Sequence, residues 1–521
     1  MTDKFYITTP IYYVNDKPHI GHAYTTIAAD VVARFQRARG RDVFFLTGTD
    51  EHGIKICKSA ADQNTTPQEL SDRVVVHFHG LWNDLEITHD DFIRTSAKRH
   101  EERVASLVQR LLERGQIYRG RYEGWYDEGQ EEFVSENSAA AAGYLSPVSG
   151  QALVRFSEEA WFFRLSAWVP ALIEHIESHP SFILPPSRRN EVLSKLRLGV
   201  EDLCISRPAG KLMNWGVPMP NDPEHSVYVW IDALANYLTG LGFPPLGEDE
   251  TDERFGLYWP PDLQLLGKDI LWFHAVYWPA LLLALELPLP AKIFAHGWWL
   301  SEGRKMSKSL GNFISREEIA DICREYGVDV FRYYLLRAVP FGQDGNFSRK
   351  GLFYAYNAEL ANGVGNLLSR TVNMIGRYCG GRVPERFQPG AEEEEVIAAA
   401  KRLLQEGPDR LERLEFQQYL EAVIGLESAS NRYIEVTEPF KLARDPDRQE
   451  RVEQVLRTCA ESVRIILSSL LPVMPLKAAE GLKMLGLDPA VPFREEWDAI
   501  PSGTRPIPGP GLFPRRKEEG K

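Results

Sequence analysis

The fold is decided by the stretch FYITTPIYYV at residues 5–14, together with the segments that follow it. This stretch is rich in β-branched and aromatic residues, so it predicts a buried strand despite Pro10. Turn residues at 15–18 come next, followed by a helical periodicity over residues 19–37 and a second apolar run at 42–46. A strand, a helix and a second strand predict an α/β fold with a doubly wound, Rossmann-like parallel sheet.

The α/β pattern is interrupted between about residues 116 and 224 by short aromatic strands and loops rich in proline and glycine. This interruption predicts an inserted α+β domain. Three apolar runs, at residues 227–231, 264–266 and 293–299, then predict further strands of the sheet. From Gly351 onward the pattern is almost entirely helical, and we expect the extended stretch 501–514 to pack back as a tail.

The composition is that of an ordinary globular protein of two to four domains, since 521 residues exceed what one core usually supports. A net charge of -13 argues against nonspecific coating of nucleic acid but allows a structured RNA to bind local basic surface. The five cysteines stand singly, which predicts no disulfide framework. The N-terminus has no signal-peptide pattern, and the apolar run 275–285 is too short to span a bilayer, so we expect a cytoplasmic protein without a membrane partner.

The first chemical motif is PHIGH at residues 18–22, at the predicted start of the first helix. A helix N-terminus offers N–H groups and a positive dipole to a phosphate, and His19 and His22 add donors one turn apart. Gly21 lets a nucleotide approach the backbone because it has no side chain. Taken alone, the two histidines also fit a metal half-site or two surface residues.

The second motif is GRKMSKSLGN at residues 303–312, a loop that contains Lys305 and Lys308. A flexible cationic loop can fold over a triphosphate and stabilise the charge that builds on departing pyrophosphate. Taken alone, the motif also fits a solvated basic loop. The chain has no G-x-x-x-x-G-K-[ST] sequence, so a nucleotide triphosphate would have to bind without a P-loop.

Together the two motifs resemble the HIGH and KMSKS signatures of class I aminoacyl-tRNA synthetases, in the same order and each after a predicted strand. The matching positions are His19, Gly21, His22, Lys305, Met306, Ser307, Lys308 and Ser309. Further stretches resemble the methionyl-tRNA synthetase family over nearly the whole chain: TGTDEHG at 47–53, YEGWY at 122–126, VWIDAL at 229–234, GKDI at 267–270 and GLFPR at 511–515. The resemblance implies an enzyme that activates methionine with ATP to methionyl-adenylate and transfers it to the 3′ end of tRNA(Met).

The resemblance also implies roles for individual residues. His19, His22, Lys305 and Lys308 would be catalytic and, with Gly21, Met306 and Ser307, would bind ATP and its Mg²⁺. The implied methionine-binding residues are Pro10, Ile11, Tyr13, Asp50, Trp230, Ala233, Tyr237, Ile270, His274 and Trp278, with Asp50 receiving the substrate ammonium. Aromatic rings suit the thioether sulfur, although any one of these aromatics alone also fits core packing. Trp230 and Tyr237 are expected at a strand-to-helix junction, and His274 and Trp278 one helical turn apart.

The helical C-terminal part resembles the anticodon-binding bundle of the same family through NAELANGVGN at 357–366. Asn366 and Arg370, one turn apart, and Pro439 with Phe440 are implied to meet the anticodon, although capping or packing also fits the first pair. Phe440 replaces the tryptophan of the family pattern but keeps a ring that can stack on a base. Asp127 stands where a cysteine of a zinc knuckle is often found, so no structural zinc is expected.

The implied domain order is a first catalytic half at 1–115, a zinc-free inserted connective domain at 116–224, a second catalytic half with the KMSKS loop at 225–312, a linking stem-contact region at 313–356, an anticodon-binding helical bundle at 357–505 and a tail at 506–521. We expect a monomer, because no appended domain follows the bundle.

The insertion is too short for the editing domain of the leucyl, isoleucyl and valyl relatives. The alternative is a catalytically inactive, synthetase-like RNA-binding protein, a class that usually loses a signature residue.

Overall fold

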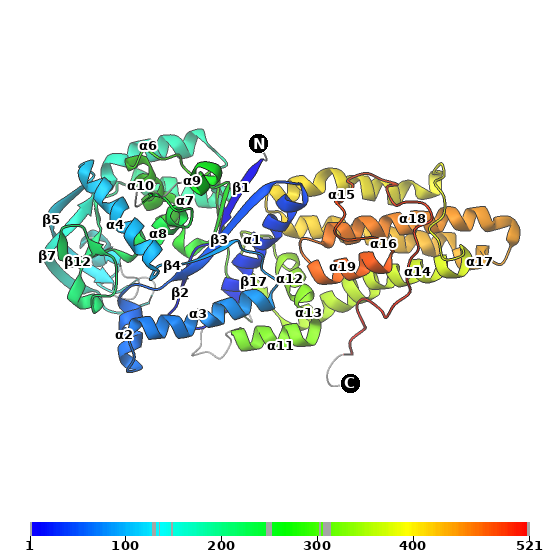
Figure 1. Ribbon diagram of the computed structural model, residues 1–521, viewed down its shortest axis with the longest axis horizontal. Helices are drawn as coiled ribbons and strands as arrows, with labels where there is room; N and C mark the ends of the chain where they lie inside the picture. The colour runs from blue at the N-terminus through cyan, green and yellow to red at the C-terminus, as the bar shows by residue number, and fades with distance from the viewer. Residues whose placement is uncertain are drawn as a thin grey trace. The chain divides into compact units, whose positions relative to one another are not determined.

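The computed structural model describes residues 3–127, 132–134, 136–146, 149–245, 253–301, 304–305 and 314–517. The chain forms two compact units, and Figure 1 labels many of their helices and strands. The first unit comprises residues 1–18, 41–83 and 88–296, and the second comprises 19–40, 84–87 and 297–521. No described helix is both long enough and apolar enough to cross a membrane.

A parallel sheet forms the centre of the first unit. Its strands are β1 (Lys4–Thr8), β2 (Tyr12–Tyr13), β3 (Asp42–Asp50), β4 (Asp91–Arg94), β8 (Ile183–Leu184), β13 (Leu263–Gly267) and β14 (Ile293–His296). Their order is β2-β3-β1-β13-β14-β8, with β4 paired to β3, and every pairing is parallel. The residues of β1 after Lys4 are all buried, as expected for a parallel strand that is covered on both faces. The predicted α/β class with a parallel sheet is confirmed.

The predicted strands at residues 5–14 and 227–231 differ from the structure. The stretch 5–14 divides into β1 and β2, because Pro10 between them has no N–H to donate to the ladder. The run 227–231 ends strand β12 (Asp222–Val227) and begins helix α8 (Val229–Thr239), so Trp230 and Tyr237 both lie on the helix. A short apolar run does not distinguish a buried strand from a buried helix, which explains the second difference.

Helices and two small antiparallel sheets complete the first unit. The helices are α2 (Ile54–Asp62), α3 (Pro67–Asp84), α4 (Lys98–Glu113), α5 (Glu136–Ala141), α6 (Leu165–Ser178), α7 (Pro186–Arg197), α8, α9 (Glu253–Tyr258), a π-helical turn at Phe273–Tyr277 and α10 (Trp278–Ala284). One small sheet contains β5 (Ile117–Asp127), β6 (Glu132–Val134), β7 (Val154–Phe163) and β9 (Leu203–Cys204), and the other contains β10 (Ser206–Pro208), β11 (Pro218–Met219) and β12. The predicted inserted stretch also supplies β8 to the central sheet.

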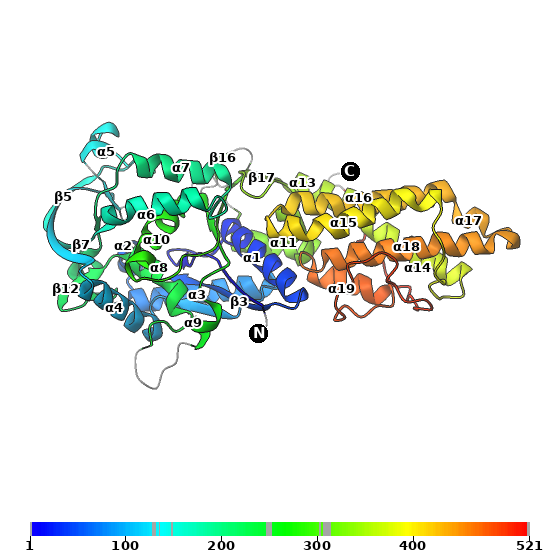
Figure 2. The same cartoon turned by 90° about the horizontal axis from the view of Figure 1, so that it is seen from above.

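The second unit is mostly helical. Its helices are α1 (Ile20–Ala38), α11 (Arg316–Tyr326), α12 (Val328–Arg337), α13 (Arg349–Ala355), a π-helix at Tyr356–Gly365, α14 (Asn366–Tyr378), α15 (Glu394–Glu412), α16 (Phe416–Thr437), α17 (Pro439–Leu442), α18 (Gln449–Leu470) and α19 (Pro475–Met484). Helices α15, α16 and α18 lie side by side in both views (Figures 1 and 2). A small sheet joins β15 (Trp299–Ser301) to β16 (Arg304–Lys305) and β17 (Gly345–Phe347).

The apolar run 293–299 does not form a single strand, and the C-terminal tail contacts the helical part of the second unit. The run is interrupted at Gly297, where a Cβ would lie 2.2 Å from the carbonyl oxygen of Gln343, so β14 and β15 belong to different sheets. In the tail, Phe513 is buried and packs edge-on against Tyr356, with ring centroids 6.3 Å apart. The Tyr356 hydroxyl donates to the Pro514 carbonyl at 2.7 Å, which confirms that the tail packs back.

Candidate active site

The first turn of α1 carries the two histidines of the first motif. His19 is the N-cap residue, and its Nδ1 accepts a hydrogen bond from the Gly21 N–H at 3.0 Å. The Nδ1 of His22 in turn accepts from the His19 N–H at 3.0 Å, which completes a reciprocal capping box. Burial and the neighbouring His19 lower the pKa of His22 well below its ordinary value, so this ring is neutral at pH 7. A neutral imidazole that accepts at Nδ1 carries its proton on Nε2, which makes the Nε2–H of His22 a donor.

Gly21 is required by the cap itself. A Cβ at this position would lie 2.9 Å from Cε1 and 3.1 Å from Nδ1 of His19. The sequence predicts that Gly21 leaves room for a nucleotide; in the structure that space is next to the His19 ring. A side chain at this position would therefore push His19 out of its capping geometry.

Both ends of the segment that carries the second motif are anchored on α1. Before the segment, Trp299 of β15 packs edge-on against Tyr24, with ring centroids 5.5 Å apart. After the segment, the Ile314 carbonyl accepts from the N–H of Ile20 at 3.2 Å. The contacts fall on the first two turns of α1, which also carry the paired histidines.

The residues of the second motif are only partly described. Lys305 lies on β16 and pairs with Leu300 of β15. Met306, Ser307 and Lys308 lie outside the described residues. The predicted approach of Lys308 to the triphosphate therefore stays a prediction.

Four of the predicted methionine-binding side chains contact one another in the first unit. Trp230 and Tyr237 lie on α8, His274 lies in the π-helical turn, and Trp278 begins α10. The Tyr237 hydroxyl lies 2.7 Å from Nε2 of His274, and the ring of Trp230 meets His274 edge-on at 6.4 Å. The rings of Tyr237 and Trp278 are 5.6 Å apart. The two aromatic pairs expected to share one site are thus in contact.

His274 is neutral in this cluster. Burial lowers the pKa of His274 to about 4, although the Ile270 carbonyl that contacts the ring opposes the shift. Nδ1 of His274 lies 3.0 Å from that carbonyl, which can only accept, so Nδ1 carries the proton. Nε2 is then an acceptor, and the Tyr237 hydroxyl donates to it. The cluster is an uncharged wall with oriented polar groups, which suits an apolar thioether.

The strand ends bring further predicted residues together. Tyr13 of β2 pairs with Asp50 at the end of β3, although the two are far apart in sequence. Pro10 and Ile11 occupy the connection between β1 and β2. Ala233 is buried on α8, one helical turn from both Trp230 and Tyr237. All ten predicted methionine-binding residues belong to the first unit, whereas the described ATP-binding residues belong to the second.

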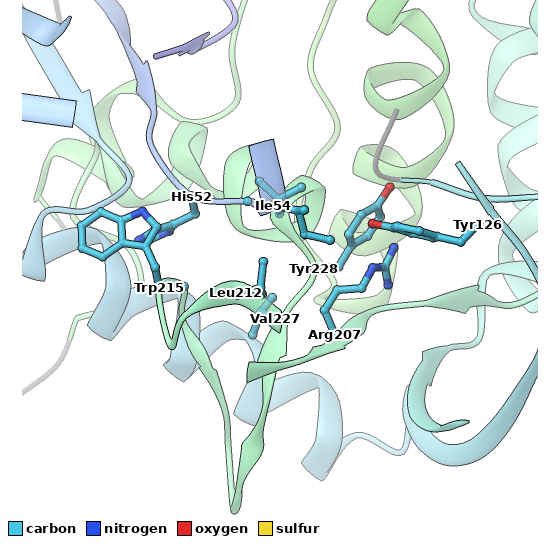
Figure 3. Close-up of a pocket in the computed structure, with 11 residues that line it drawn as sticks. His52, Ile54, Tyr126, Arg207, Leu212, Trp215, Val227 and Tyr228 are labelled. Carbon is cyan, nitrogen blue, oxygen red and sulfur yellow. The ribbon is translucent and has the colours of Figure 1, made fainter. Parts of the chain in front are cut away.

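A small cavity lies in the first unit beside the predicted methionine residues but includes none of them. Figure 3 shows its lining, which comprises His52, Gly53, Ile54, Tyr126, Arg207, Leu212, Trp215, Gly216, Val227, Tyr228 and Val229. The guanidinium carbon of Arg207 lies 5.3 Å from the ring centre of Tyr126 and 4.1 Å from that of Tyr228. This buried cation was not predicted, because a single sequence does not show which tyrosines surround an arginine.

A buried ionic network lies next to this cavity, and it was not predicted from the sequence either. Asp232 of α8 is bound by Nδ1 of His52 at 2.7 Å and by Nε2 of His100 at 2.9 Å. Nδ1 of His100 lies 2.7 Å from the Thr239 hydroxyl. Burial alone would lower the pKa of His52, but Asp232 outweighs it and raises that pKa; burial alone would raise the pKa of Asp232, but the two histidines lower it. His52 and Asp232 stand in the stretches 47–53 and 229–234, yet only the fold shows that they meet.

The predicted anticodon residues lie on two helices of the second unit. Asn366 and Arg370 are half-buried on α14, and Pro439 and Phe440 begin α17. Both helices pack against α18. Pro439 is buried, whereas Phe440 is 40% exposed and presents its ring at the surface.

Comparison with known proteins agrees with this geometry. A family model for class I tRNA synthetases (M) matches residues 5–141 and 144–372. The methionine–tRNA ligase of Caldanaerobacter subterraneus subsp. tengcongensis is 45% identical over 99% of this chain and 79% of its own length. The chain belongs to the methionyl-tRNA synthetase family.

Further members of the methionyl-tRNA synthetase family are similar over whole chains. The methionine–tRNA ligase of Rickettsia felis is 45% identical over 94% of this chain and 93% of its own length. The structure of Mycobacterium tuberculosis methionyl-tRNA synthetase in complex with methionyl-adenylate has a TM-score of 0.90 and 39% identity, and covers 99% of this chain and 100% of that one. The apo form of the same enzyme has a TM-score of 0.86, 36% identity and 99% coverage of both chains.

The described part of this synthetase contains no group of three or more histidine, cysteine, aspartate or glutamate residues that could hold a metal. The cysteines are all free thiols. Residues 128–131, 135 and 147–148 of the inserted stretch lie outside the described residues. The absence of structural zinc stays a prediction.

Proposed function

We propose that this chain is a methionine–tRNA ligase that activates methionine with ATP and transfers it to the 3′ end of tRNA(Met). Family membership supports the reaction, as does the complex of the Mycobacterium tuberculosis relative with methionyl-adenylate. The observation that carries the proposal is the histidine cap of α1, on which both flanks of the lysine-bearing segment are anchored. The relatives compared above are named as ligases, which gives no support to a catalytically inactive RNA-binding protein.

In the first step, the methionine carboxylate attacks the α-phosphorus of ATP in line. One phosphorus–oxygen bond forms to methionine, and the bond to pyrophosphate breaks. ATP enters as its magnesium complex, so the metal arrives with the substrate. His19 and His22 would donate to phosphate oxygens, and Lys305 and Lys308 would neutralise the departing pyrophosphate. Loss of one such preorganised donor costs roughly 2.7 to 4 kcal/mol of barrier.

In the second step, a ribose hydroxyl of the terminal tRNA adenosine attacks the carbonyl carbon of the adenylate. AMP leaves with the bonding electrons, and the hydroxyl proton passes to solvent or phosphate. No covalent intermediate with the enzyme forms. The protein's contribution is to bind and orient both reactants.

Methionine would bind with its side chain against the Trp230, Tyr237 and His274 cluster. Sulfur–aromatic contacts contribute about 0.3 to 1.5 kcal/mol each. Because His274 is neutral, the wall offers no charge that would favour a polar competitor. Asp50 would receive the substrate ammonium.

Recognition of tRNA would use the bundle, with Asn366 and Arg370 on α14 and the exposed Phe440 ring on α17. A flat aromatic ring stacks on a splayed base and contributes roughly 1 to 3 kcal/mol.

The protein would act as a monomer in the cytoplasm without structural zinc.

The proposed function is tested by ATP–pyrophosphate exchange with each of the twenty standard amino acids, followed by charging of tRNA(Met). Exchange with methionine alone is the expected result. A further variant, His22→Asn, should lower the exchange rate while methionine binding persists. If no amino acid supports exchange, the result would favour the alternative, a catalytically inactive RNA-binding protein.

A further inference from the structure

Two carboxylates stand next to each other where β3 ends. Asp50 is the last residue of the strand and is 8% exposed, whereas Glu51 is completely buried. The Glu51 carboxylate accepts from Nε and Nη2 of Arg94, at 2.7 and 2.9 Å. The hydroxyl of Thr49 donates to it at 2.6 Å, and the hydroxyl of Ser96 donates as well. A carboxylate has about four acceptor sites, so Glu51 has none left for a substrate ammonium.

The main chain around these carboxylates is held on both sides. The Glu51 N–H donates to the hydroxyl of Thr95 at 2.8 Å, and the Glu51 carbonyl accepts from the indole N–H of Trp215 at 2.6 Å. On the other side, the Asp50 carbonyl accepts from the N–H of Val14 at 3.2 Å. Every polar group of Glu51 is therefore bonded, and the backbone that aims Asp50 has little freedom.

Arg94 is placed for this contact by the sheet. It is the last residue of β4, where it pairs with Thr49 of β3, one strand position before Asp50. Its Nη2 also donates to Asp72 of α3 at 2.5 Å. A bidentate arginine–carboxylate pair adds geometric specificity as well as energy, because two parallel hydrogen bonds fix one orientation.

We propose that Glu51 and Arg94 are positioning residues for methionine, which fix the direction in which Asp50 presents its carboxylate to the substrate ammonium. The inference rests on the proposed function, because it assigns Asp50 the ammonium of methionine. Glu51 and Arg94 act through Asp50 and through the backbone of the strand end. A displacement of about 1 Å in a binding group can reduce activity up to about 100-fold, so their loss should appear in methionine binding.

The first experiment compares Glu51→Gln and Arg94→Lys with the wild-type enzyme in ATP–pyrophosphate exchange. We expect the KM for methionine to rise about tenfold or more, while the KM for ATP stays within about twofold. Arg99→Lys is the matched control, because Arg99 makes a similar fork to Asp91 at the other end of β4, at 2.9 and 2.8 Å, on an exposed surface. An equal rise in both KM values, or a rise in the control, would contradict a positioning role.

The second experiment asks whether Glu51 acts through Asp50. Equilibrium dialysis with radiolabelled methionine measures affinity in Asp50→Asn and in the double variant Asp50→Asn/Glu51→Gln. If Glu51 only aims Asp50, the double variant should bind within about twofold of the single Asp50 variant. The proposal would be wrong if the loss of methionine affinity in the double variant equalled the product of the losses caused by Asp50→Asn and Glu51→Gln separately. If Glu51→Gln does not fold, as judged by circular dichroism and thermal unfolding, Arg94→Lys and Thr95→Val carry the same test.

The outcomes separate this inference from the proposed function. A wild-type enzyme that supports no methionine-dependent exchange would refute the function. Normal wild-type exchange, with an unchanged KM for methionine in both Glu51→Gln and Arg94→Lys, would refute only the positioning role.

Discussion

His52 and His274 are both buried in the first unit, yet they carry different charges because their partners differ. His52 contacts the carboxylate of Asp232 at 2.7 Å, and this partner raises its pKa. His274 contacts a carbonyl and a phenol, neither of which compensates for burial, and its pKa falls to about 4. Burial lowers the pKa of both histidines, so the difference in their charge follows from their neighbours.

The neutral state of His274 predicts acid sensitivity of the first unit. Its folded pKa of about 4 lies below the ordinary value of 6.5, so its contribution to stability is complete above pH 6.5 and is lost as the pH falls towards 4. A shift of about 2.5 pKa units corresponds to roughly 3 to 4 kcal/mol. Between pH 7 and 4, the unfolding free energy should fall more in the wild type than in His274→Asn. The difference between the two falls should be of this size. Urea titrations at several pH values measure it, and parallel pH profiles would contradict the assignment.

Phe440 gives a residue-scale test of tRNA recognition. Its ring is 40% exposed at the start of α17, so removing it should cost little stability. We expect Phe440→Ala to lower kcat/KM for charging of tRNA(Met) about 10- to 100-fold, because stacking on a base contributes roughly 1 to 3 kcal/mol. Exchange without tRNA should be unaffected. Phe440→Trp should retain charging, and a loss of exchange in either variant would point to misfolding instead of lost stacking.

At the scale of single elements, the start of α1 combines capping with chemistry. Nδ1 of His22 accepts from the His19 N–H, and Nδ1 of His19 accepts from the Gly21 N–H, which leaves Nε2 of each ring to carry a proton. Most helices are capped by serine, threonine, aspartate or asparagine. Here imidazole rings accept the hydrogen bonds of the backbone N–H groups at the helix start. The same hydrogen bonds hold the two rings in a defined orientation, with centroids 3.9 Å apart.

Gly21→Ala should affect catalysis by the His19 ring much more than it affects the stability of the fold. Disturbing the His19 cap costs about 0.5 to 2 kcal/mol, and alanine in place of glycine returns roughly 1 kcal/mol of helix propensity. The net change in unfolding free energy should therefore be small, whereas exchange activity should fall by about tenfold or more, because the His19 ring is displaced. Gly425→Ala on α16, where a Cβ meets no atom within 4 Å, is the control and should be slightly stabilising. Unchanged exchange in Gly21→Ala would show that the ring position is unimportant.

At the scale of the molecule, Arg332 joins separate parts of the second unit. The side chain is completely buried on α12 and donates to Asp30 of α1 at 2.7 Å. It also donates to the carbonyls of Leu85, Pro472 and Val473, at 2.9, 3.0 and 2.9 Å. One guanidinium therefore links the histidine-bearing helix to the turn that follows α18.

Removal of Arg332 should be costly because Asp30 loses one of its arginine partners, although Arg34 still donates to it, and three buried carbonyls lose a donor. We expect Arg332→Met to lower the unfolding free energy by about 3 to 5 kcal/mol, as measured by urea denaturation. Adding Asp30→Asn should recover part of the loss, since it removes a buried negative charge that has lost one of its arginine partners. Arg349→Met, which breaks an exposed pair with Glu318, should change stability by less than about 1 kcal/mol. Additive losses from Arg332 and Asp30 would show that the pair is not coupled.

Features that depend on neighbours along the chain could be predicted without the fold. The apolar stretch before Pro10, the start of α1 at the His19 motif and the helical turn between His274 and Trp278 all follow from local pattern. The paired motifs indicated a class I synthetase, and the further matching stretches indicated the methionyl family. Where local pattern was ambiguous, as at residues 227–231, the predicted strand was wrong, because the same apolar run can be buried as a strand or as a helix.

Contacts between polar groups that are distant in sequence depend on how the chain folds. Glu51 is saturated by Arg94, His52 meets Asp232, and Arg332 meets Asp30 across wide gaps in sequence. The energy of a buried charge depends on the partners that enclose it, and those partners are set by how helices and strands pack together. Charge states and positioning residues are therefore properties of the fold, whereas the motifs that name the chemistry are properties of the chain.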